Sequence, residues 1–379
     1  MPDTDPQLLS PLTLRGLTLR NRLAVSPMCQ YSAVDGLPND HHLVHLGRFA
    51  MGGFGLVLLE STAVLPEGRI TPGDLGIWSD EQVAPLARIA SLLKSYGAAA
   101  GIQLGHAGPK ASTQRPWQGF GPLNGDDASR GEAAWPTVSA SANPAVEGWP
   151  EPAALSQEGI AEVKAAFVAA ARRALDAGFD VVELHCAHGY LLNAFLSPLA
   201  NHRTDAYGGD LAGRMRLPLE VARELRAVVP DDRPLFVRVS AVDGELTGTT
   251  ADDTVAFARE LKAVGVDVVD CSSGGVGKRY AHPEHYGYQV PYAARVRNEA
   301  GVASMAVGLV VDPAQAEAIV AGGEADLVAL GRTALDDPNW PLHAAEALGG
   351  GADWPLQAAW AMDKRAPLLE RLGPWAPAT

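Results

Sequence analysis

Two histidines and a tyrosine lie close together in the segment HCAHGY, where His185, His188 and Tyr190 follow an apolar run. Three interpretations of the histidines are open at this point. As metal ligands they would need further partners, such as His106 or Cys186, and an open coordination position. As hydrogen-bond donors they would hold one developing oxyanion, and losing one such donor typically costs about 3 kcal/mol of transition-state stabilisation. The third interpretation is a purely structural pair.

An arginine, Arg238, interrupts the apolar run PLFVRVS at 234 to 240. A guanidinium in a buried strand is rarely left unpaired, so the sequence predicts an anionic partner for it. That partner is either an acidic side chain on a neighbouring strand or a bound anion. Gly308, and Gly331 followed by Arg332, end two later apolar runs and could form a phosphate site, because glycine permits close backbone approach.

Short apolar runs that could position these side chains recur along the chain between longer amphipathic stretches. This alternation is typical of βα units whose strands are buried on both faces. The sequence predicts an α/β fold, a (β/α)8 TIM barrel whose functional face is formed by the carboxyl ends of its strands. An open doubly wound sheet is the alternative, but neither G-x-G-x-x-G nor a Walker A string follows any strand. The strands are expected at 23–27, 55–61, 99–105, 180–185, 234–240, 266–272, 303–308 and 325–331, and the clearest helices at 156–178, 250–265 and 312–323.

Two segments break this rhythm. Residues 106–155 are rich in Gly, Pro and Trp without a clear period, so we expect a long loop after the third strand that covers part of the barrel mouth. Trp117 and Trp135 are lid candidates there, with simple packing as the alternative. The tail at 349–379 is expected to be irregular, and the whole chain, 1–379, to form one domain with a barrel core at about 20–348.

Composition narrows the class of partner. The net charge is −14 and no Lys/Arg run occurs, which argues against a nucleic-acid or membrane partner and favours a small-molecule substrate. The apolar runs are too short to span a bilayer and the first residues do not resemble a secretory signal, so we expect a cytoplasmic protein. Cys29, Cys186 and Cys271 are widely spaced, and we expect three free thiols.

Several of these strand ends resemble the old yellow enzyme family, in particular its bacterial subclass of xenobiotic reductases and thermophilic-type ene-reductases. The resemblance covers nearly the whole chain. It is carried by RNRLAVSPMCQYSA at 20–33, GRITPGDLGIWSDEQ at 68–82, GIQLGHAG at 101–108, HCAHGYLLNAFLSPLANHRTDAYGG at 185–209, PLFVRVS at 234–240 and DLVALGR at 326–332.

The resemblance implies FMN bound without a covalent link at the top of the barrel, with NADPH or NADH as reductant. On that basis Arg238 would lie near the flavin edge that gains negative charge on reduction, which explains a buried cation better than an ion pair does. Gly308, Gly331 and Arg332 would hold the phosphate, and Gln103 the pyrimidine edge. The implied cofactor-binding residues are Ser26, Pro27, Met28, Cys29, Ser61, Gln103, Arg238, Gly308, Gly331 and Arg332.

The resemblance also implies the catalytic chemistry. His185 and His188 would bind the carbonyl oxygen of an activated alkene, Tyr190 would protonate its α-carbon, and Tyr31 would help seat the substrate. Cys29 would modulate the flavin potential and substrate binding rather than act as a nucleophile. Reduction of α,β-unsaturated carbonyl or nitro compounds by NAD(P)H is then expected, with ping-pong kinetics because both ligands would use the same pocket.

Departures and alternatives accompany this resemblance. The family commonly has an Arg where this chain has Pro109, which leaves Lys110 to supply charge near the flavin edge. A homodimer or homotetramer is expected, and Trp360, with Arg365 second, could enter a neighbouring subunit's site or only pack the tail. A dienoyl-CoA reductase on the same barrel would need a cysteine cluster and further domains. The preferred interpretation involves no metal. The alternative from another class of enzyme is a metal-dependent hydrolase or lyase that uses His185 and His188 as ligands.

Overall fold

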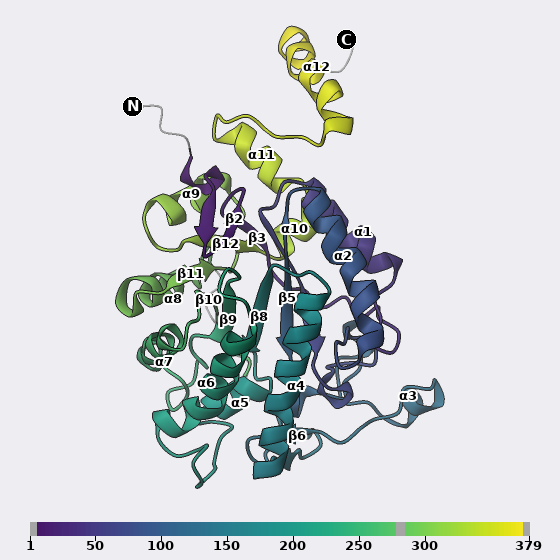
Figure 1. The fold of residues 1–379 in the computed structure, drawn as a ribbon, viewed down its shortest axis with the longest axis vertical. Coiled ribbons are helices and arrows are strands. Elements are labelled where there is room, and N and C mark those ends of the chain that lie inside the picture. The colour runs from purple at the N-terminus through teal and green to yellow at the C-terminus, as the bar shows by residue number, and fades with distance from the viewer. Residues whose placement is uncertain (1–5, 278–284, 374–379) are drawn as a thin grey trace.

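Eight parallel strands close into a barrel in the computed structural model, which describes residues 6–277 and 285–373. The barrel order is β10-β11-β12-β3-β4-β5-β8-β9, so the last strand pairs with the first and no barrel edge is left open. Helices surround the strands (Figure 1). The predicted TIM-barrel fold is confirmed. The barrel strands are β3 (Leu23–Val25), β4 (Leu56–Ala63), β5 (Ala99–Gly105), β8 (Val181–Cys186), β9 (Leu235–Ser240), β10 (Val268–Ser272), β11 (Ala303–Ala306) and β12 (Leu327–Leu330).

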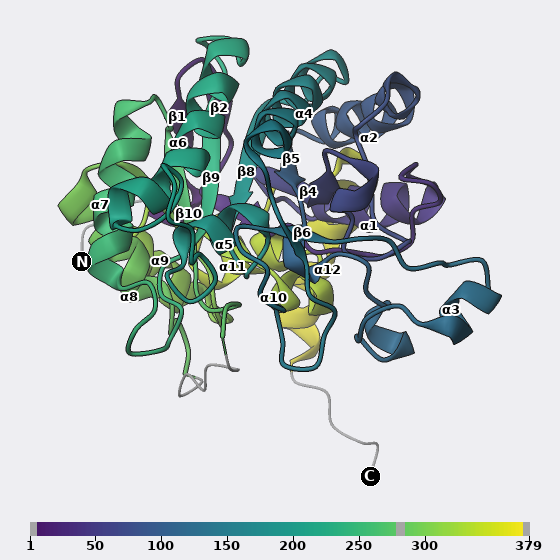
Figure 2. The ribbon, with the colours of Figure 1, turned by 90° about the horizontal axis from the view of Figure 1, so that it is seen from below.

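Several of the longer helices begin at a polar N-cap, whose side chain accepts a hydrogen bond from the first turn. The helix α4, predicted at 156–178, begins after Ser156, whose side chain accepts a hydrogen bond from the Gly159 N–H. Thr250 caps α7 in the same way, and Asp312 caps α9. Figure 2 shows the helices arranged around the barrel from below. Their bounds are α1 (Asp40–Met51), α2 (Val83–Ser95), α4 (Gln157–Asp176), α5 (Leu191–Leu196), α6 (Leu211–Val228), α7 (Ala251–Ala263), α8 (Val290–Arg295), α9 (Pro313–Ala321), α10 (Arg332–Asp336) and α11 (Trp340–Ala347).

Apolar side chains fill two separate layers. One cluster, which includes Leu56, Leu58 and Phe236, fills the barrel interior. A larger cluster, which includes Val57, Leu59 and Phe167, lies between the strands and the helices. Alternate residues of β4 therefore serve the two layers, as the period of two along a strand requires. Burial on both faces explains why the strands read as continuous apolar runs.

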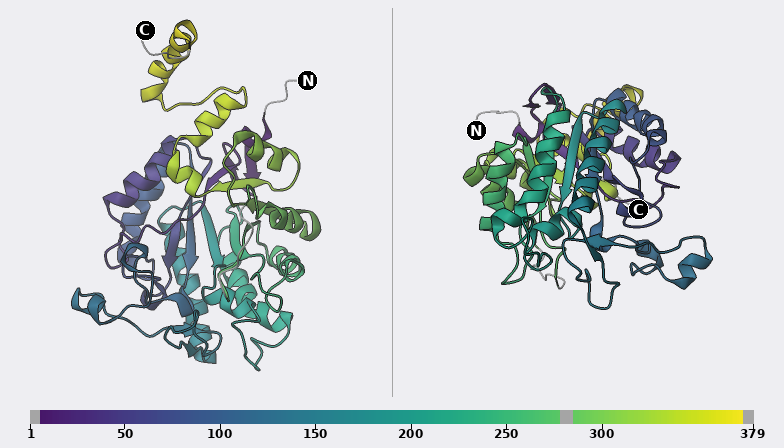
Figure 3. Two further views of the ribbon diagram at one scale, coloured as in Figure 1. Left: turned by 180° about the vertical axis from the view of Figure 1, so that it is seen from behind. Right: turned by 60° about the horizontal axis from the view of Figure 1, so that its bottom comes forward.

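The segment at 106–155 contains only short elements: α3 (Gly125–Ser129), β6 (Val138–Ser139) and β7 (Ala153–Ala154). Its two strands pair with each other in a small separate sheet. The part around α3 extends sideways from the barrel in Figures 2 and 3, whereas the part around Trp135 packs beside Tyr31 and Tyr190. Thus only part of this segment lies near the mouth. At the N-terminal side, β1 (Leu12–Leu14) and β2 (Leu17–Leu19) form an antiparallel hairpin.

The tail contains a helix that the sequence pattern did not predict. The helix α12 (Leu356–Leu372) spans 17 residues, so the expectation of an irregular tail is wrong for this stretch. Figures 1 and 3 show it extending from the barrel at the end opposite to the segment around β6. Leu356, Trp360 and Leu372 are 83%, 64% and 72% exposed, so the helix has little of the packing that normally stabilises one. Pro367 lies within it, and a proline inside a run argues against a helix when only the sequence is considered.

No helix among the described residues combines the length and apolarity that crossing a bilayer requires. The single domain predicted for residues 1–379 stays a prediction.

Candidate active site

A cavity of about 280 Å³ opens at the carboxyl ends of the strands. It brings together most of the predicted cofactor residues, which come from β3, β9, β11 and β12. Cys29, Ser61 and Gln103 are not part of its described lining. Several lining residues were missed by sequence reasoning, among them Ser272, Tyr288, Gln289 and Thr333. The predicted residues that line it are Ser26, Pro27, Met28, His188, Arg238, Gly308, Gly331 and Arg332.

Gly308 is held in a conformation that only glycine adopts easily. Its φ is +116°, and a Cβ at this position would lie 2.7 Å from Nε2 of Gln289. The Gln289 side chain is itself fixed, because Nε2 donates to the Val307 carbonyl at 3.2 Å. Gly308 therefore keeps this end of the cavity open beside Gly331 and the exposed Arg332. A glycine-lined wall with an exposed guanidinium beside it is suited to a phosphate group.

Arg238 has an acidic partner within the barrel. Its Nε lies 3.0 Å from Oδ2 of Asp270 on the neighbouring strand, and both side chains are buried. The ion pair with a neighbouring strand, which the sequence interpretation ranked below a bound anion, is therefore present. Arg238 also lines the cavity, so it can contact a bound anion there while it is paired with Asp270.

His185 and His188 contact each other. Their ring centroids are 5.2 Å apart at an interplanar angle of 80°, and His188 Nδ1 lies 3.4 Å from His185 Nε2. His185 Nδ1 accepts from the Ala187 N–H at 3.2 Å, which assigns the ring proton to Nε2. His188 Nε2 lies 2.7 Å from the Ser272 hydroxyl. Each ring thus directs one N–H to a partner that a ligand oxygen could replace: His188 Nδ1 for His185, and the Ser272 hydroxyl for His188.

Both histidines are neutral over the physiological range. Burial, followed by the charges of Arg238 and Lys110, lowers the pKa of His185 to about 3. Burial and Arg238 also lower the pKa of His188 well below its usual value. A neutral imidazole can donate one hydrogen bond to a carbonyl oxygen without taking part in acid–base chemistry.

His188 adopts a strained backbone conformation that the surrounding loops maintain. Its φ of +62° is rare for a residue with a side chain, and such outliers often occur at functional sites. The His188 N–H donates to Ser240 Oγ at 2.9 Å, and its carbonyl accepts from Lys110 Nζ at 2.8 Å. Lys110 also donates to the Gly275 carbonyl at 2.5 Å. Lys110 therefore braces the turn behind His188 and is absent from the described lining of the cavity that contains Arg238, and its charge near the flavin edge stays a prediction.

Tyr190, Tyr31 and Cys29 pack together on one small apolar cluster formed by Ile70, Ala107 and Ala111. The Tyr190 ring lies 4.9 Å from that of His185. Burial raises the pKa of Tyr190 well above its usual value, so its hydroxyl remains protonated. Burial likewise raises the pKa values of the Cys29 thiol and of Tyr31. A protonated phenol beside a donor pair is suited to delivering a proton.

Two tryptophans from the segment at 106–155 border this cluster. Trp135 packs against it and donates from Nε1 to the Glu67 carbonyl at 3.0 Å. The Trp117 ring meets Tyr31 edge-on at 6.0 Å but is 66% exposed. Trp135 is thus anchored, whereas Trp117 has room to move.

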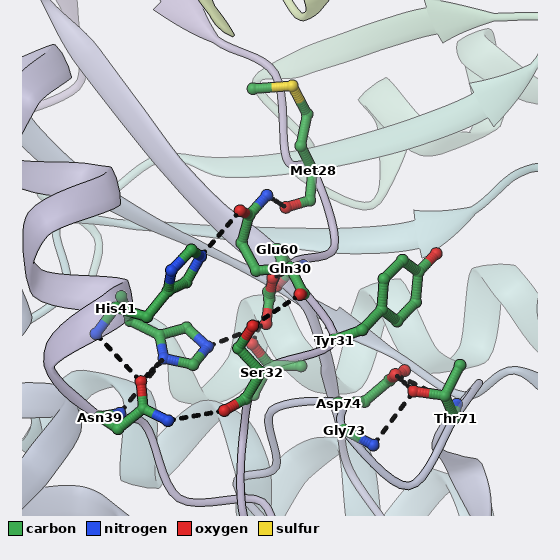
Figure 4. A network of polar contacts seen from close by, with 12 residues as sticks. Met28, Gln30, Tyr31, Ser32, Asn39, His41, Glu60, Thr71, Gly73 and Asp74 are labelled. Atoms are coloured by element: carbon green, nitrogen blue, oxygen red, sulfur yellow. Dashed lines mark hydrogen bonds and ion pairs between the residues drawn. The ribbon is translucent and has the colours of Figure 1, made fainter. Parts of the chain in front are cut away.

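The loop that carries Cys29 and Tyr31 is tied to a β-bulge (Figure 4). Leu59 pairs with Ile102 and Ser61 pairs with Gln103, so Glu60 is an extra residue without a partner in the ladder. Its carboxylate accepts from the Gln30 N–H and lies 3.4 Å from His42 Nε2. Gln30 in turn accepts from His41 at 3.1 Å and donates to the Met28 carbonyl at 2.9 Å. The bulge therefore fixes this loop and leaves Ser61 on the same face as Gln103.

No group of three or more His, Cys, Asp or Glu side chains suited to a metal ion occurs within 6–277 and 285–373. His106 and Cys186, the additional ligands considered above, do not complete a site with the histidine pair. Cys29, Cys186 and Cys271 are free thiols, as predicted.

Comparisons with known proteins agree with this geometry. A family model described as the NADH:flavin oxidoreductase / NADH oxidase family matches residues 7–349. The chain belongs to this family. It is 45% identical over 346 residues to an NADPH dehydrogenase of Bacillus cytotoxicus, an alignment that covers 90% of this chain and 93% of that protein.

Solved structures extend the likeness. Morphinone reductase in complex with tetrahydroNAD aligns with a TM-score of 0.73 and 27% identity, over 93% of this chain and 98% of the other. A 2-naphthoyl-CoA reductase aligns with a TM-score of 0.81, but at 23% identity and over only 52% of that longer chain, which shows the shared fold alone. The predicted membership of the old yellow enzyme family is confirmed.

Family membership establishes a flavin-dependent NAD(P)H oxidoreductase whose cofactor is FMN. The residues of the cavity fit that group. Gly308 leaves space that a Cβ would fill, Arg332 lines the cavity with an exposed side chain, and Arg238 lines it from the barrel interior. The metal-dependent hydrolase is thereby replaced as a candidate.

Proposed function

We propose that this enzyme reduces the activated C=C bond of α,β-unsaturated carbonyl or nitro compounds with electrons from NADPH or NADH. The observation that carries the proposal is the neutral His185–His188 pair, which lies between Tyr190 and the cavity lined by Arg238. FMN, when bound, supplies the two-electron chemistry by accepting hydride from the nicotinamide and passing hydride to the alkene.

The histidines activate the alkene by binding its carbonyl or nitro oxygen. The 3.4 Å contact between the rings is at the long limit of a hydrogen bond, so an incoming oxygen can replace it at little cost. The His188 N–H exchanges Ser272 for the same oxygen. Two donors on one oxygen withdraw electrons from the conjugated bond and stabilise the charge that develops there.

Tyr190 completes the reaction by donating its hydroxyl proton to the α-carbon. Its raised pKa keeps that proton in place until the substrate requires it. Tyr31 and Cys29, on the same apolar cluster, seat the substrate, and Cys29 modulates the flavin. The cavity lining supports the cofactor-binding roles proposed for Ser26, Pro27, Met28, Arg238, Gly308, Gly331 and Arg332. The roles proposed for Ser61 and Gln103, which pair with each other on neighbouring strands, rest on the family resemblance.

A ping-pong order follows from the shared pocket, because nicotinamide and alkene would occupy the same position in turn. The experiment is the visible spectrum of the purified protein, followed by anaerobic addition of NADPH and then of an enone such as cyclohexenone. We expect a yellow protein that NADPH bleaches and the enone re-oxidises, with the saturated ketone as product. Re-oxidation without a saturated product would contradict alkene reduction.

We also propose a cytoplasmic homodimer or homotetramer. The support is α12, which presents Leu356, Trp360 and Leu372 to solvent although such side chains are normally covered. A second copy of the chain would cover them, and Trp360 or Arg365 would then approach the partner's mouth.

A further inference from the structure

Four polar side chains form a layer inside the barrel. Gln103 on β5, Glu183 on β8, Arg238 on β9 and Asp270 on β10 share the inward face of their strands with Phe236 and Val268 below them. Glu183 and Asp270 are 0% exposed. The layer separates the apolar interior from the cavity, which only Arg238 reaches.

The contacts in this layer are paired. Gln103 Nε2 donates to Glu183 Oε1 at 2.8 Å, and Arg238 Nε lies 3.0 Å from Asp270 Oδ2. Each acid thus holds one residue that we have proposed as a flavin contact. Glu183 Oε2, Arg238 Nε and both carboxylate oxygens of Asp270 have no hydrogen-bond partner among the described residues, so the Arg238–Asp270 contact is an ion pair without a hydrogen bond.

Stability does not explain this arrangement. Burying carboxylates costs several kcal/mol per ion, and well-packed apolar side chains in their place are often neutral or stabilising. Burial and the charge of Asp270 raise the pKa of Glu183 to about 8, and burial also raises the pKa of Asp270, so the two acids share a single negative charge at neutral pH, which the ion pair with Arg238 places on Asp270. The layer then contains one guanidinium balanced by one carboxylate.

We propose that Asp270 and Glu183 are positioning residues that orient Arg238 and Gln103 and set how strongly this enzyme favours reduced over oxidised FMN. The inference rests on the proposed placement of FMN above Arg238. Asp270 offsets the guanidinium charge, which would otherwise favour the more negative, reduced flavin. Glu183 accepts the hydrogen bond from Gln103 Nε2, which fixes the amide and leaves its oxygen available to the flavin.

The test compares the holoenzyme with Asp270→Asn and Glu183→Gln by measuring the reduction potential and the dissociation constant of oxidised FMN. Asp270→Asn leaves Arg238 uncompensated, so the preference for reduced over oxidised FMN should rise roughly tenfold. Ser304→Ala is the matched control. Ser304 is buried on the adjacent strand β11, but it lies on the opposite face from Met305, which packs in the barrel interior, so it is outside the polar layer. This variant should leave the preference unchanged.

Glu183→Gln keeps the shape of the side chain at position 183 and removes its ability to carry a negative charge. The charged groups that face Glu183 are Asp270 and Arg238, and Cys186 on the same strand is the other titratable group that senses its charge. At pH 7 this variant should keep the wild-type preference within about twofold, since Glu183 is already largely neutral there. Above pH 8 the wild-type Glu183 ionises, and the two proteins should diverge.

An Asp270→Asn protein with normal FMN content and an unchanged preference would overturn the inference. If that variant does not fold, identical behaviour of wild type and Glu183→Gln at pH 9 would overturn it instead. Failure of the proposed function is distinguishable, because it would show as wild-type holoenzyme that NADPH bleaches but an enone does not re-oxidise.

Discussion

At the scale of single residues, the site depends on side chains whose charge is suppressed. His185, His188 and Tyr190 are all held in their neutral forms by burial. A neutral donor pair and a protonated phenol can act on a polarised alkene without competing for protons. The residues that keep them neutral are thus as important as the residues themselves.

Replacing both His185 and His188 with Ala should slow alkene reduction by at least about 1,000-fold, because both donors to the oxygen are lost and the loss of one alone typically costs about 100- to 1,000-fold. FMN content should be unchanged, and NADPH should still bleach the protein. Stopped-flow measurement of the two half-reactions checks this. Loss of flavin from the variant would show that these histidines hold the cofactor instead.

Replacing Tyr190 with Phe should slow the oxidative half-reaction at least about 100-fold, because general-acid catalysis is removed while the ring packing is kept. The reductive half-reaction should retain its rate. Tyr207→Phe is a suitable control, since its hydroxyl bonds to Glu220 on the outer helix α6. Equal slowing of both half-reactions by Tyr190→Phe would contradict a specific proton-donor role.

The pH dependence should reflect the suppressed histidine charge. Because the pKa of His185 is lowered to about 3, this ring stays neutral as pH falls from 8 to 5 and becomes charged only in stronger acid. We therefore expect no histidine limb near pH 6.5 in the rate of alkene reduction. An acid limb near that pH in the wild type that disappears in His185→Asn would refute this expectation.

At the scale of elements, the barrel positions these residues through strand ends and the turns that follow them. Strand order, strand limits and the principal helices could be predicted because buried parallel strands leave a continuous apolar signature. The conformations of the turns could not. Tyr31 and His188 both have positive φ, which nothing in their residue types indicates. The Arg238–Asp270 pair also went unassigned, because spacing along the chain does not reveal which strands are neighbours.

Gly308 provides a test at this scale. Gly308→Val should weaken FMN binding roughly tenfold or more, because a β-branched side chain is strained at a φ of +116° and would meet Gln289. Fluorescence titration of the apoprotein with FMN measures the change. Gly349→Val is the control, since its φ is also positive but nothing lies within 4 Å of its Cβ position. Equal loss in both variants would indicate general strain rather than a cofactor contact.

At the scale of the whole molecule, the composition correctly indicated a small-molecule enzyme, whereas the tail was misjudged. Helix α12 packs little against the barrel, so its sequence does not need the apolar pattern by which a packed helix is predicted. Pro367 also lies within it. Such a helix is stable mainly through packing, and the packing partner would be another copy of the chain.

Truncation after Ala352 should dissociate the oligomer and lower alkene reduction by about tenfold, because a side chain such as Trp360 no longer reaches the partner's mouth. Light scattering and steady-state kinetics measure the two effects. Trp360→Ala in the full chain separates them, since it should lower activity with assembly retained. Unchanged assembly and activity after truncation would refute the proposed role of α12.

The bulge at Glu60 has a consequence for how this site could arise. Leu58 faces the barrel interior, Leu59 faces the helices and Ser61 lies on the same face as Gln103, so removing Glu60 alone leaves a regular alternation. In genetic terms, one codon separates an ordinary barrel strand from one that anchors the loop carrying Cys29 and Tyr31. A single in-frame insertion can therefore add an anchor to an existing scaffold without reassigning any other side chain of that strand.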